Sequence, residues 1–167
     1  MIQLTAQHQL GQFIVSFQHA EAALTEMLVL MFDADDEAVR ILVSEFEYSK
    51  RVRATDVMFA RFADLHLCLD ETAKTDFHKL MEDLLKLGER RNTIVHSKYT
   101  PWINTEGSHG LIRENSKLKS KKGIRECEEE ELLPEAFAAD FNHLTLALRT
   151  LEGFRLRIID TLYPVEG

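Results

Sequence analysis

The sequence contains few of the residues that interrupt or cross-link a chain, and this shortage limits the classes of protein it can belong to. Its 167 residues include only 3 prolines, 7 glycines and 2 cysteines. The cysteines, Cys68 and Cys127, form no C-x-x-C motif, which argues against a disulfide framework and against a thiolate metal site. The scarcity of turn-forming residues, together with 45% hydrophobic residues, is typical of one helical domain with a single core.

Positive charge and long apolar runs are also lacking. The formal net charge of -8 argues against the overall basic surface of a general nucleic-acid-binding protein, although it is compatible with a local basic groove. No uninterrupted apolar run reaches the length of about 18 residues that a membrane-spanning helix needs, and the first residues lack the basic start of a signal peptide. We therefore expect a cytoplasmic protein that has no membrane partner.

Apolar residues recur with the 3.6-residue period of amphipathic helices over most of the chain. This pattern predicts a long helix over about residues 5–32, a short helix capped by Asp35 or Asp36, and a third helix near residues 49–69. A fourth helix begins near residue 70 and is expected to end at Pro101, and a last helix follows Pro134. The fold class predicted is all-α, an up-and-down bundle of about five helices in a single domain spanning residues 1–167.

Residues 100–133 depart from the helical pattern and are predicted to form an inserted loop or small hairpin between the last two long helices. The segment is first basic and then acidic, ending in the run "EEEE" at residues 128–131. In a chain of negative charge its cations are the best candidates for contacts with phosphates, and the alternative is a solvated loop. They are Arg113, Lys117, Lys119, Lys121, Lys122 and Arg125. A second basic candidate is "SKRVR" at residues 49–53, with Lys50 and Arg51.

The segment "ERRNTIVHSKY" at residues 89–99 places polar residues at the end of an apolar-striped helix. At about 100° per residue, Arg91 falls on the apolar stripe, whereas Asn92, His96 and Tyr99 share a second stripe. A charged group on a buried face costs several kcal/mol unless it is paired, so its position requires an explanation. Because Arg91 and His96 diverge by about 140°, a site that uses both needs a distorted helix end or a second subunit.

These residue types suit the cleavage of RNA without a metal ion. A histidine exchanges protons near neutral pH, and a guanidinium donates two parallel hydrogen bonds to a phosphate. The nucleophile would be the 2′-hydroxyl of the RNA, so the protein needs no nucleophile and no cofactor. Metal-dependent hydrolysis is less favoured, because "DADDE" at residues 33–37 lacks the glycine of a calcium loop and no H-E-x-x-H motif occurs. The simpler alternative is that Arg90 and Arg91 complement the helix dipole and His96 caps the helix.

The stretch from Arg91 to His96 resembles the R-x(4-6)-H motif of the HEPN superfamily, including the asparagine that often follows the arginine. The likeness extends to the helical context, with the motif near the end of a long, late helix. The resemblance implies a homodimer whose two motifs face each other and act as a metal-independent endoribonuclease, in toxin–antitoxin, antiphage or RNA-processing systems. It also implies that Arg91 stabilises the phosphate, that His96 transfers protons and that Asn92 assists.

We therefore predict a homodimeric, metal-independent endoribonuclease, a toxin or antiphage effector with RNA as substrate and a cognate inhibitor protein as a further partner. The alternatives are a non-catalytic HEPN-like dimer that binds nucleotide, RNA or protein, and a purely structural helical dimer. The predicted catalytic residues are Arg91, Asn92 and His96. The predicted substrate-binding residues are Arg90, Lys98, Tyr99, Lys50, Arg51, Lys119, Lys121 and Lys122.

Overall fold

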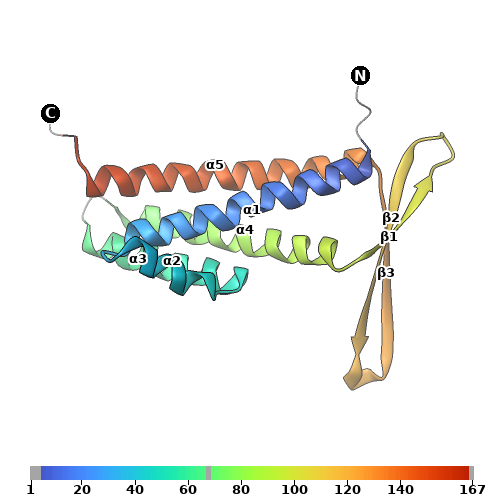
Figure 1. Cartoon of the computed structure of the whole chain (residues 1–167), viewed down its shortest axis with the longest axis horizontal. Coiled ribbons are helices and arrows are strands. Elements are labelled where there is room, and N and C mark those ends of the chain that lie inside the picture. The colour runs from blue at the N-terminus through green and yellow to red at the C-terminus, as the bar shows by residue number, and fades with distance from the viewer. Residues whose placement is uncertain (1–4, 67–68, 166–167) are drawn as a thin grey trace. The chain divides into compact units, whose positions relative to one another are not determined.

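A computed structural model describes residues 5–66 and 69–165, a range that leaves out Cys68, and it shows a mostly helical protein with an inserted sheet (Figure 1). The described residues form five α-helices and three antiparallel strands, so the prediction of about five helices with a hairpin insertion is confirmed. The helices are α1 (Ala6–Met31), α2 (Asp36–Ser44), α3 (Tyr48–Leu65), α4 (Glu71–Val95) and α5 (Phe137–Leu162). The strands are β1 (Lys98–Ile103), β2 (His109–Lys119) and β3 (Ile124–Leu132).

The start of α2 follows the local chemistry of its sequence. The carboxylate of Asp35 accepts a hydrogen bond of 2.8 Å from the backbone N–H of Ala38, and the first turn carries Asp36 and Glu37. Both features stabilise the N-terminus of α2, because the cap satisfies a free N–H group and the acidic side chains complement the positive end of the helix dipole. The predicted N-terminal cap is therefore confirmed at Asp35.

The end of α4 differs from the prediction. The helix ends at Val95 instead of continuing to Pro101, and Pro101 lies within β1. Proline is tolerated there because β1 is an edge strand, where a missing N–H group breaks no ladder on the free side. The β-branched and aromatic residues of "KYTPWI" favour a strand over a helix. Tyr99 therefore belongs to the sheet, and its predicted place on a helical stripe with Asn92 and His96 is wrong.

The inserted segment forms a sheet in the order β1-β2-β3. Strand β1 pairs with residues 109–114 of β2, while β3 pairs with residues 111–119, so the β2–β3 hairpin continues beyond β1 as a two-stranded ribbon. The short 3-10 helix η1 (Ser120–Lys122) and Gly123, whose φ of 62° is left-handed, close the hairpin. Glycine suits this position because other residues rarely adopt a positive φ.

The described chain divides into two compact units. The sheet unit comprises residues 1–17 and 89–143, and the helical unit comprises residues 18–88 and 144–167. In the sheet unit, the buried side chains of Ala6, Leu111, Leu132 and Phe137 pack together. In the helical unit, the rings of Phe59 and Phe77 stack with centroids 4.0 Å apart, and Phe154 meets both rings edge to face. Each unit thus has apolar contacts of its own.

Helix α1 is long and apolar enough to cross a membrane by length and composition. Many of its large side chains are nevertheless buried inside the fold, among them Phe13, Phe17, Leu24, Met27 and Leu28, although Val15 is exposed. The same composition is typical of the core helix of a globular protein, and the burial of these residues agrees with that role.

Two glycines in helices provide a test of the packing in the helical unit. A Cβ atom added at Gly88 would lie 2.5 Å from Cε1 of Tyr48, whose hydroxyl donates a hydrogen bond of 2.9 Å to the carbonyl of Leu84. We expect Gly88→Ala to lower the free energy of unfolding by about 1–3 kcal/mol, because the held ring has to shift. No atom lies within 4 Å of a Cβ at Gly153, so Gly153→Ala should stabilise the protein by about 0.5–1 kcal/mol.

Urea denaturation followed by circular dichroism measures both changes. Equal stabilisation by the two alanines would contradict the close approach of α4 to Tyr48.

Candidate functional site

Arg90 lies in the last turns of α4 and binds two carboxylates. Its Nη1 and Nη2 donate to the two oxygens of Glu130 at 3.0 and 3.2 Å, and its Nε donates to Asp140 at 3.0 Å. Burial lowers the pKa of Arg90, but the two carboxylates outweigh burial and the net direction is upward. The guanidinium is therefore permanently charged and already neutralised by acids of β3 and α5.

Arg113 of β2 holds Glu130 from the other side. Its Nε donates to Glu130 at 2.7 Å and its Nη1 donates to the hydroxyl of Ser97 at 3.1 Å, while only 6% of its side chain is exposed. Burial raises the pKa of Glu130. The hydrogen bonds and positive charges of Arg90 and Arg113 lower it by more than burial raises it, so the pKa lies below its ordinary value. We call Arg90, Arg113, Glu130 and Asp140 the charge clamp. The sequence reasoning grouped Arg113 with surface cations and missed Glu130 and Asp140.

One signal in the sequence points to the charge clamp. The basic segment and the run "EEEE" are separated by a turn, and antiparallel pairing places Arg113 directly opposite Glu130. The pairing of a basic strand with an acidic strand is favourable because opposite charges meet across the ladder. The sequence does not reveal this register, since a shift of one residue would place different charges opposite each other.

Arg91 and Asn92 form a pair on the surface of α4. Nη1 of Arg91 donates to Oδ1 of Asn92 at 3.1 Å, and the guanidinium carbon lies 5.8 Å from the ring centroid of Phe17. Arg91 is half-buried and Asn92 is exposed. The position of Arg91 on the apolar face is thus explained by a cation–π contact with the buried ring of Phe17. The ring attracts a positive charge, which an aliphatic side chain does not.

His96 follows the last residue of α4 and is exposed. Its backbone N–H donates to the carbonyl of Asn92 at 3.0 Å, so the helical turn carries the imidazole to the first residues of the sheet. The side chain lines a hollow of about 390 Å³ on the sheet, together with Lys98, Glu114, Asn115, Ser116, Arg125, Cys127 and Glu129. The structure thus brings His96 together with the predicted Lys98 and with polar residues of β2 and β3.

The two central residues of the predicted site have different partners within the described chain. Among residues 5–66 and 69–165, Arg91 and His96 share no hydrogen bond, because Arg91 binds Asn92 beside Phe17 whereas His96 faces the sheet. The sequence argument that a site using both requires a second subunit or a distorted helix end is consistent with this geometry.

The remaining predicted residues occupy different environments. Tyr99 points inward, where its hydroxyl donates to the carbonyl of Ile94 at 2.7 Å, and burial raises its pKa. Lys119 pairs with Glu126 at 2.6 Å, while Lys121 and Lys122 are exposed in the hairpin turn. Tyr99 therefore supports the helix end, and the hairpin turn keeps two cations free of salt bridges within the described residues.

Lys50 and Arg51 belong to the helical unit, on α3. Lys50 is exposed, whereas Arg51 donates to the backbone carbonyls of Glu21, Val43 and Phe46 at 3.2–3.4 Å. The carbonyl of Glu21 lies within α1, and those of Val43 and Phe46 lie at the end of α2 and just beyond it. Arg51 thus has a structural role in its own unit.

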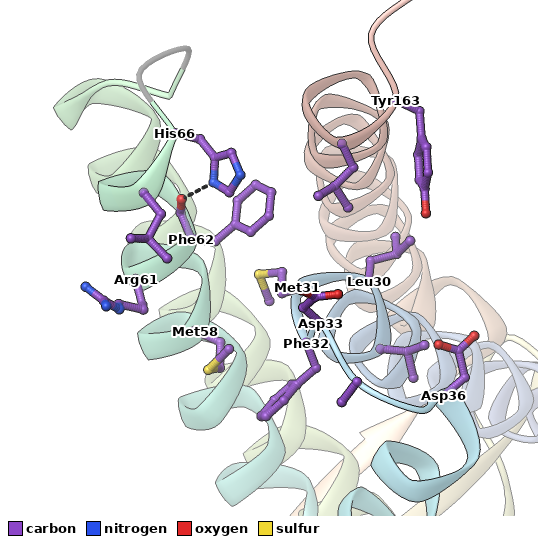
Figure 2. A pocket seen from close by; sticks show the side chains of 14 residues that line it. Leu30, Met31, Phe32, Asp33, Asp36, Met58, Arg61, Phe62, His66 and Tyr163 are labelled. Carbon is purple, nitrogen blue, oxygen red and sulfur yellow. Dashed lines mark hydrogen bonds between the residues drawn. The ribbon is translucent and has the colours of Figure 1, made fainter.

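The helical unit contains a different hollow, of about 550 Å³, formed by α1, α3, α5 and the segment before α2. Most of its walls are apolar, and Figure 2 shows His66 above the ring of Phe62. Nδ1 of His66 donates to the carbonyl of Phe62 at 2.7 Å, and the two rings stack with centroids 4.1 Å apart. None of the residues predicted for the site lines this hollow.

No protein-family model, curated protein or solved structure matches this chain. Within the described part of the chain, no group of three or more His, Cys, Asp or Glu side chains is arranged to hold a metal ion.

The charge clamp makes stability depend on pH in a defined direction. Because the folded pKa of Glu130 lies below its value in the unfolded chain, its carboxylate stabilises the fold above about pH 4.5 and loses this effect as the pH falls through the lowered pKa. Glu130→Gln should lower the free energy of unfolding at pH 7 by about 1–2 kcal/mol, since Arg113 stays buried without its counter-charge.

The difference in free energy of unfolding between wild type and Glu130→Gln should shrink steadily from pH 6 to pH 3, as measured by urea denaturation. Glu128→Gln is the matched control, because Glu128 is exposed and has no salt bridge in residues 5–66 and 69–165. If Glu130→Gln lowers the free energy of unfolding by the same amount at every pH in this range, the proposed contribution of Glu130 to the charge clamp is contradicted.

Proposed function

We propose that this protein is a metal-independent endoribonuclease that acts as a homodimer, with His96 as the proton-transfer residue and Arg91, assisted by Asn92, as the phosphate-binding residue. The observation that carries the proposal is the position of His96, which is exposed at the end of α4 and lines a hollow with Lys98 and Arg125. An imidazole exchanges protons near neutral pH, and cations beside it attract a phosphate.

The reaction follows from these residues. The imidazole of His96 takes the proton of a ribose 2′-hydroxyl, and the oxygen attacks the adjacent phosphorus. The bond from phosphorus to the 5′-oxygen breaks, and that oxygen takes up a proton, which leaves a 2′,3′-cyclic phosphate and a 5′-hydroxyl. A guanidinium stabilises the charge that develops on the phosphorane oxygens. The nucleophile comes from the substrate, so the chemistry requires no cofactor.

A second copy of the chain supplies the missing guanidinium in this proposal. Arg91 lies over Phe17 and His96 lines the hollow on the sheet, and no hydrogen bond joins the two side chains within the described residues. In a two-fold dimer, Arg91 of each subunit acts with His96 of the other, because the same surface is used twice. The order of Arg91, Asn92 and His96 at the end of a late helix supports membership of the HEPN superfamily. On that basis we propose a cytoplasmic toxin or antiphage effector with RNA as substrate and an inhibitor protein as partner.

A non-catalytic binding module is the second candidate. The observation that favours it is the engagement of Arg91 by Asn92 and Phe17, which leaves the guanidinium directed away from His96 in one chain. Such a module would bind RNA equally well before and after His96→Ala and would release no fragments, as measured by calorimetric titration and gel analysis.

Cleavage in EDTA tests the catalytic proposal. Purified protein should cut single-stranded RNA into fragments with 2′,3′-cyclic phosphate ends, and His96→Ala should lower kcat/KM by about 10²–10⁴-fold because proton transfer is lost. His143→Ala is the matched control, since His143 is an exposed histidine of α5. If wild type and His96→Ala both give only background cleavage over varied RNAs, the protein is not a ribonuclease of this kind.

Mixing two inactive variants tests the shared site. We expect Arg91→Ala and His96→Ala to be inactive alone and to recover about a quarter of wild-type activity when mixed after partial unfolding and refolding. Random pairing makes about half of the dimers mixed, and each mixed dimer has one complete site. No recovery, with mixed dimers verified by native mass spectrometry, would show that each site uses Arg91 and His96 of one chain.

A further inference from the structure

The hollow beside His96 lies on one face of the sheet. Along a strand, alternate residues share a face, so Glu114 and Ser116 of β2 point to the same side as Cys127 and Glu129 of β3. The register places Lys98 of β1 opposite Glu114, and Glu114 opposite Glu129, in one row across the three strands. The next rows contain the pair of Ser116 with Cys127 and the pair of Leu118 with Arg125.

Four charged side chains on this face lack partners among residues 5–66 and 69–165. In the described part of the chain, Lys98, Glu114, Arg125 and Glu129 form no salt bridge and no side-chain hydrogen bond. The opposite face of the same strands contrasts with this, since there Arg113 binds Glu130 and Lys119 binds Glu126. The face that carries Arg113 thus contains two ion pairs across the strands, whereas the four charged side chains beside His96 have none within the described residues.

Within this row, Lys98 opposite Glu114 is a favourable pair of charges, but Glu114 opposite Glu129 is an unfavourable one. Glu114 and Glu129 are directly opposite each other, and like charges in that position destabilise an antiparallel pair. A ligand with hydrogen-bond donors would relieve the repulsion between the carboxylates. A ligand with an anionic group would at the same time satisfy Lys98 and Arg125.

The ligand therefore carries a negative group and a set of donors, and it fits a hollow of about 390 Å³. Sites for small molecules typically have volumes of about 300–1,000 Å³, and a nucleotide is a ligand of this size class. Among the four RNA bases, guanine alone presents two adjacent donors, N1–H and the 2-amino group, on its Watson–Crick edge. A carboxylate accepts both through its two oxygens. Adenine and cytosine present a donor beside a ring acceptor, which repels a carboxylate, and uracil presents one donor between two carbonyls.

We propose that the hollow is a guanine-specific nucleotide subsite, in which Glu129 and Glu114 accept hydrogen bonds from the base and Lys98 and Arg125 bind the phosphate. As a substrate preference this rests on the proposed ribonuclease function, because it places the scissile phosphate beside His96. Cleavage then occurs at the phosphate on the 3′ side of a guanosine. Single-stranded RNA is read in this way, through the Watson–Crick edges of unpaired bases.

Binding of the four 3′-mononucleotides tests the subsite without any catalysis. By calorimetric titration, 3′-GMP should bind at least about tenfold more tightly than 3′-AMP, 3′-CMP or 3′-UMP, which corresponds to about 1.4 kcal/mol. Glu129→Gln should reduce the affinity for 3′-GMP to that for 3′-AMP, because the carboxamide replaces one acceptor with a donor. Arg125→Ala should weaken the binding of all four nucleotides by a similar factor.

Glu128→Gln is the matched control for Glu129→Gln. It changes the neighbouring residue of β3, which points to the other face of the ribbon, and should leave the preference for guanine unchanged. Glu114→Gln is a second variant of the subsite, and each of the two substitutions removes one of two like charges, which favours folding. Circular dichroism verifies the fold of every variant.

The outcomes separate the subsite from the catalytic function. The subsite is supported if 3′-GMP binds preferentially and Glu129→Gln abolishes that preference. If the same protein cuts no RNA, only the ribonuclease proposal fails. Cleavage with 3′ ends at all four nucleotides, together with equal binding of the four mononucleotides, overturns the subsite and leaves the ribonuclease proposal standing. A guanine preference that survives both Glu129→Gln and Glu114→Gln also overturns it.

Discussion

The position of the candidate site depends on one carboxylate, that of Glu130, held between two guanidinium groups. Arg90 comes from the end of α4 and Arg113 from the middle strand of the sheet, and both donate to Glu130. An arginine as deeply buried as Arg113 is costly unless it is paired and hydrogen-bonded, so the helix end and the sheet retain this arrangement only together. Asp140 binds Arg90 as well and adds the first turns of α5 to the same network.

The clamp also determines where His96 is placed. Arg113 donates to the hydroxyl of Ser97, and that hydroxyl donates back to the carbonyl of Thr93 in the last turn of α4. Tyr99 binds the carbonyl of Ile94 in the same turn. Both residues therefore satisfy carbonyl groups that a helix end leaves without partners. His96 and Lys98 alternate with Ser97 and Tyr99 along the chain, and it is His96 and Lys98 that line the hollow on the sheet.

The two faces of the β2–β3 ribbon have different roles because of this alternation. On one face, Arg113 pairs with Glu130 and Lys119 pairs with Glu126 across the two strands. On the other face, four charged side chains beside His96 have no salt bridge among the described residues. A chain with a net charge of -8 thus presents both signs of charge in a small polar hollow, which suits a ligand that carries an anion and donors.

The amino-acid sequence by itself determined the helices, the cap at Asp35, the interruption after residue 100 and the basic and acidic halves of the insertion, because these depend on periodicity and on residues near in sequence. It could not determine the end of α4, because the partner that makes the segment after His96 a strand, β2, is distant in the chain. Only the tertiary structure decided that Arg113 is buried against Glu130 and that His96 lies beside Lys98 and Glu114 in one hollow on the sheet. These facts depend on strand register and on contacts between distant segments, which local sequence does not encode.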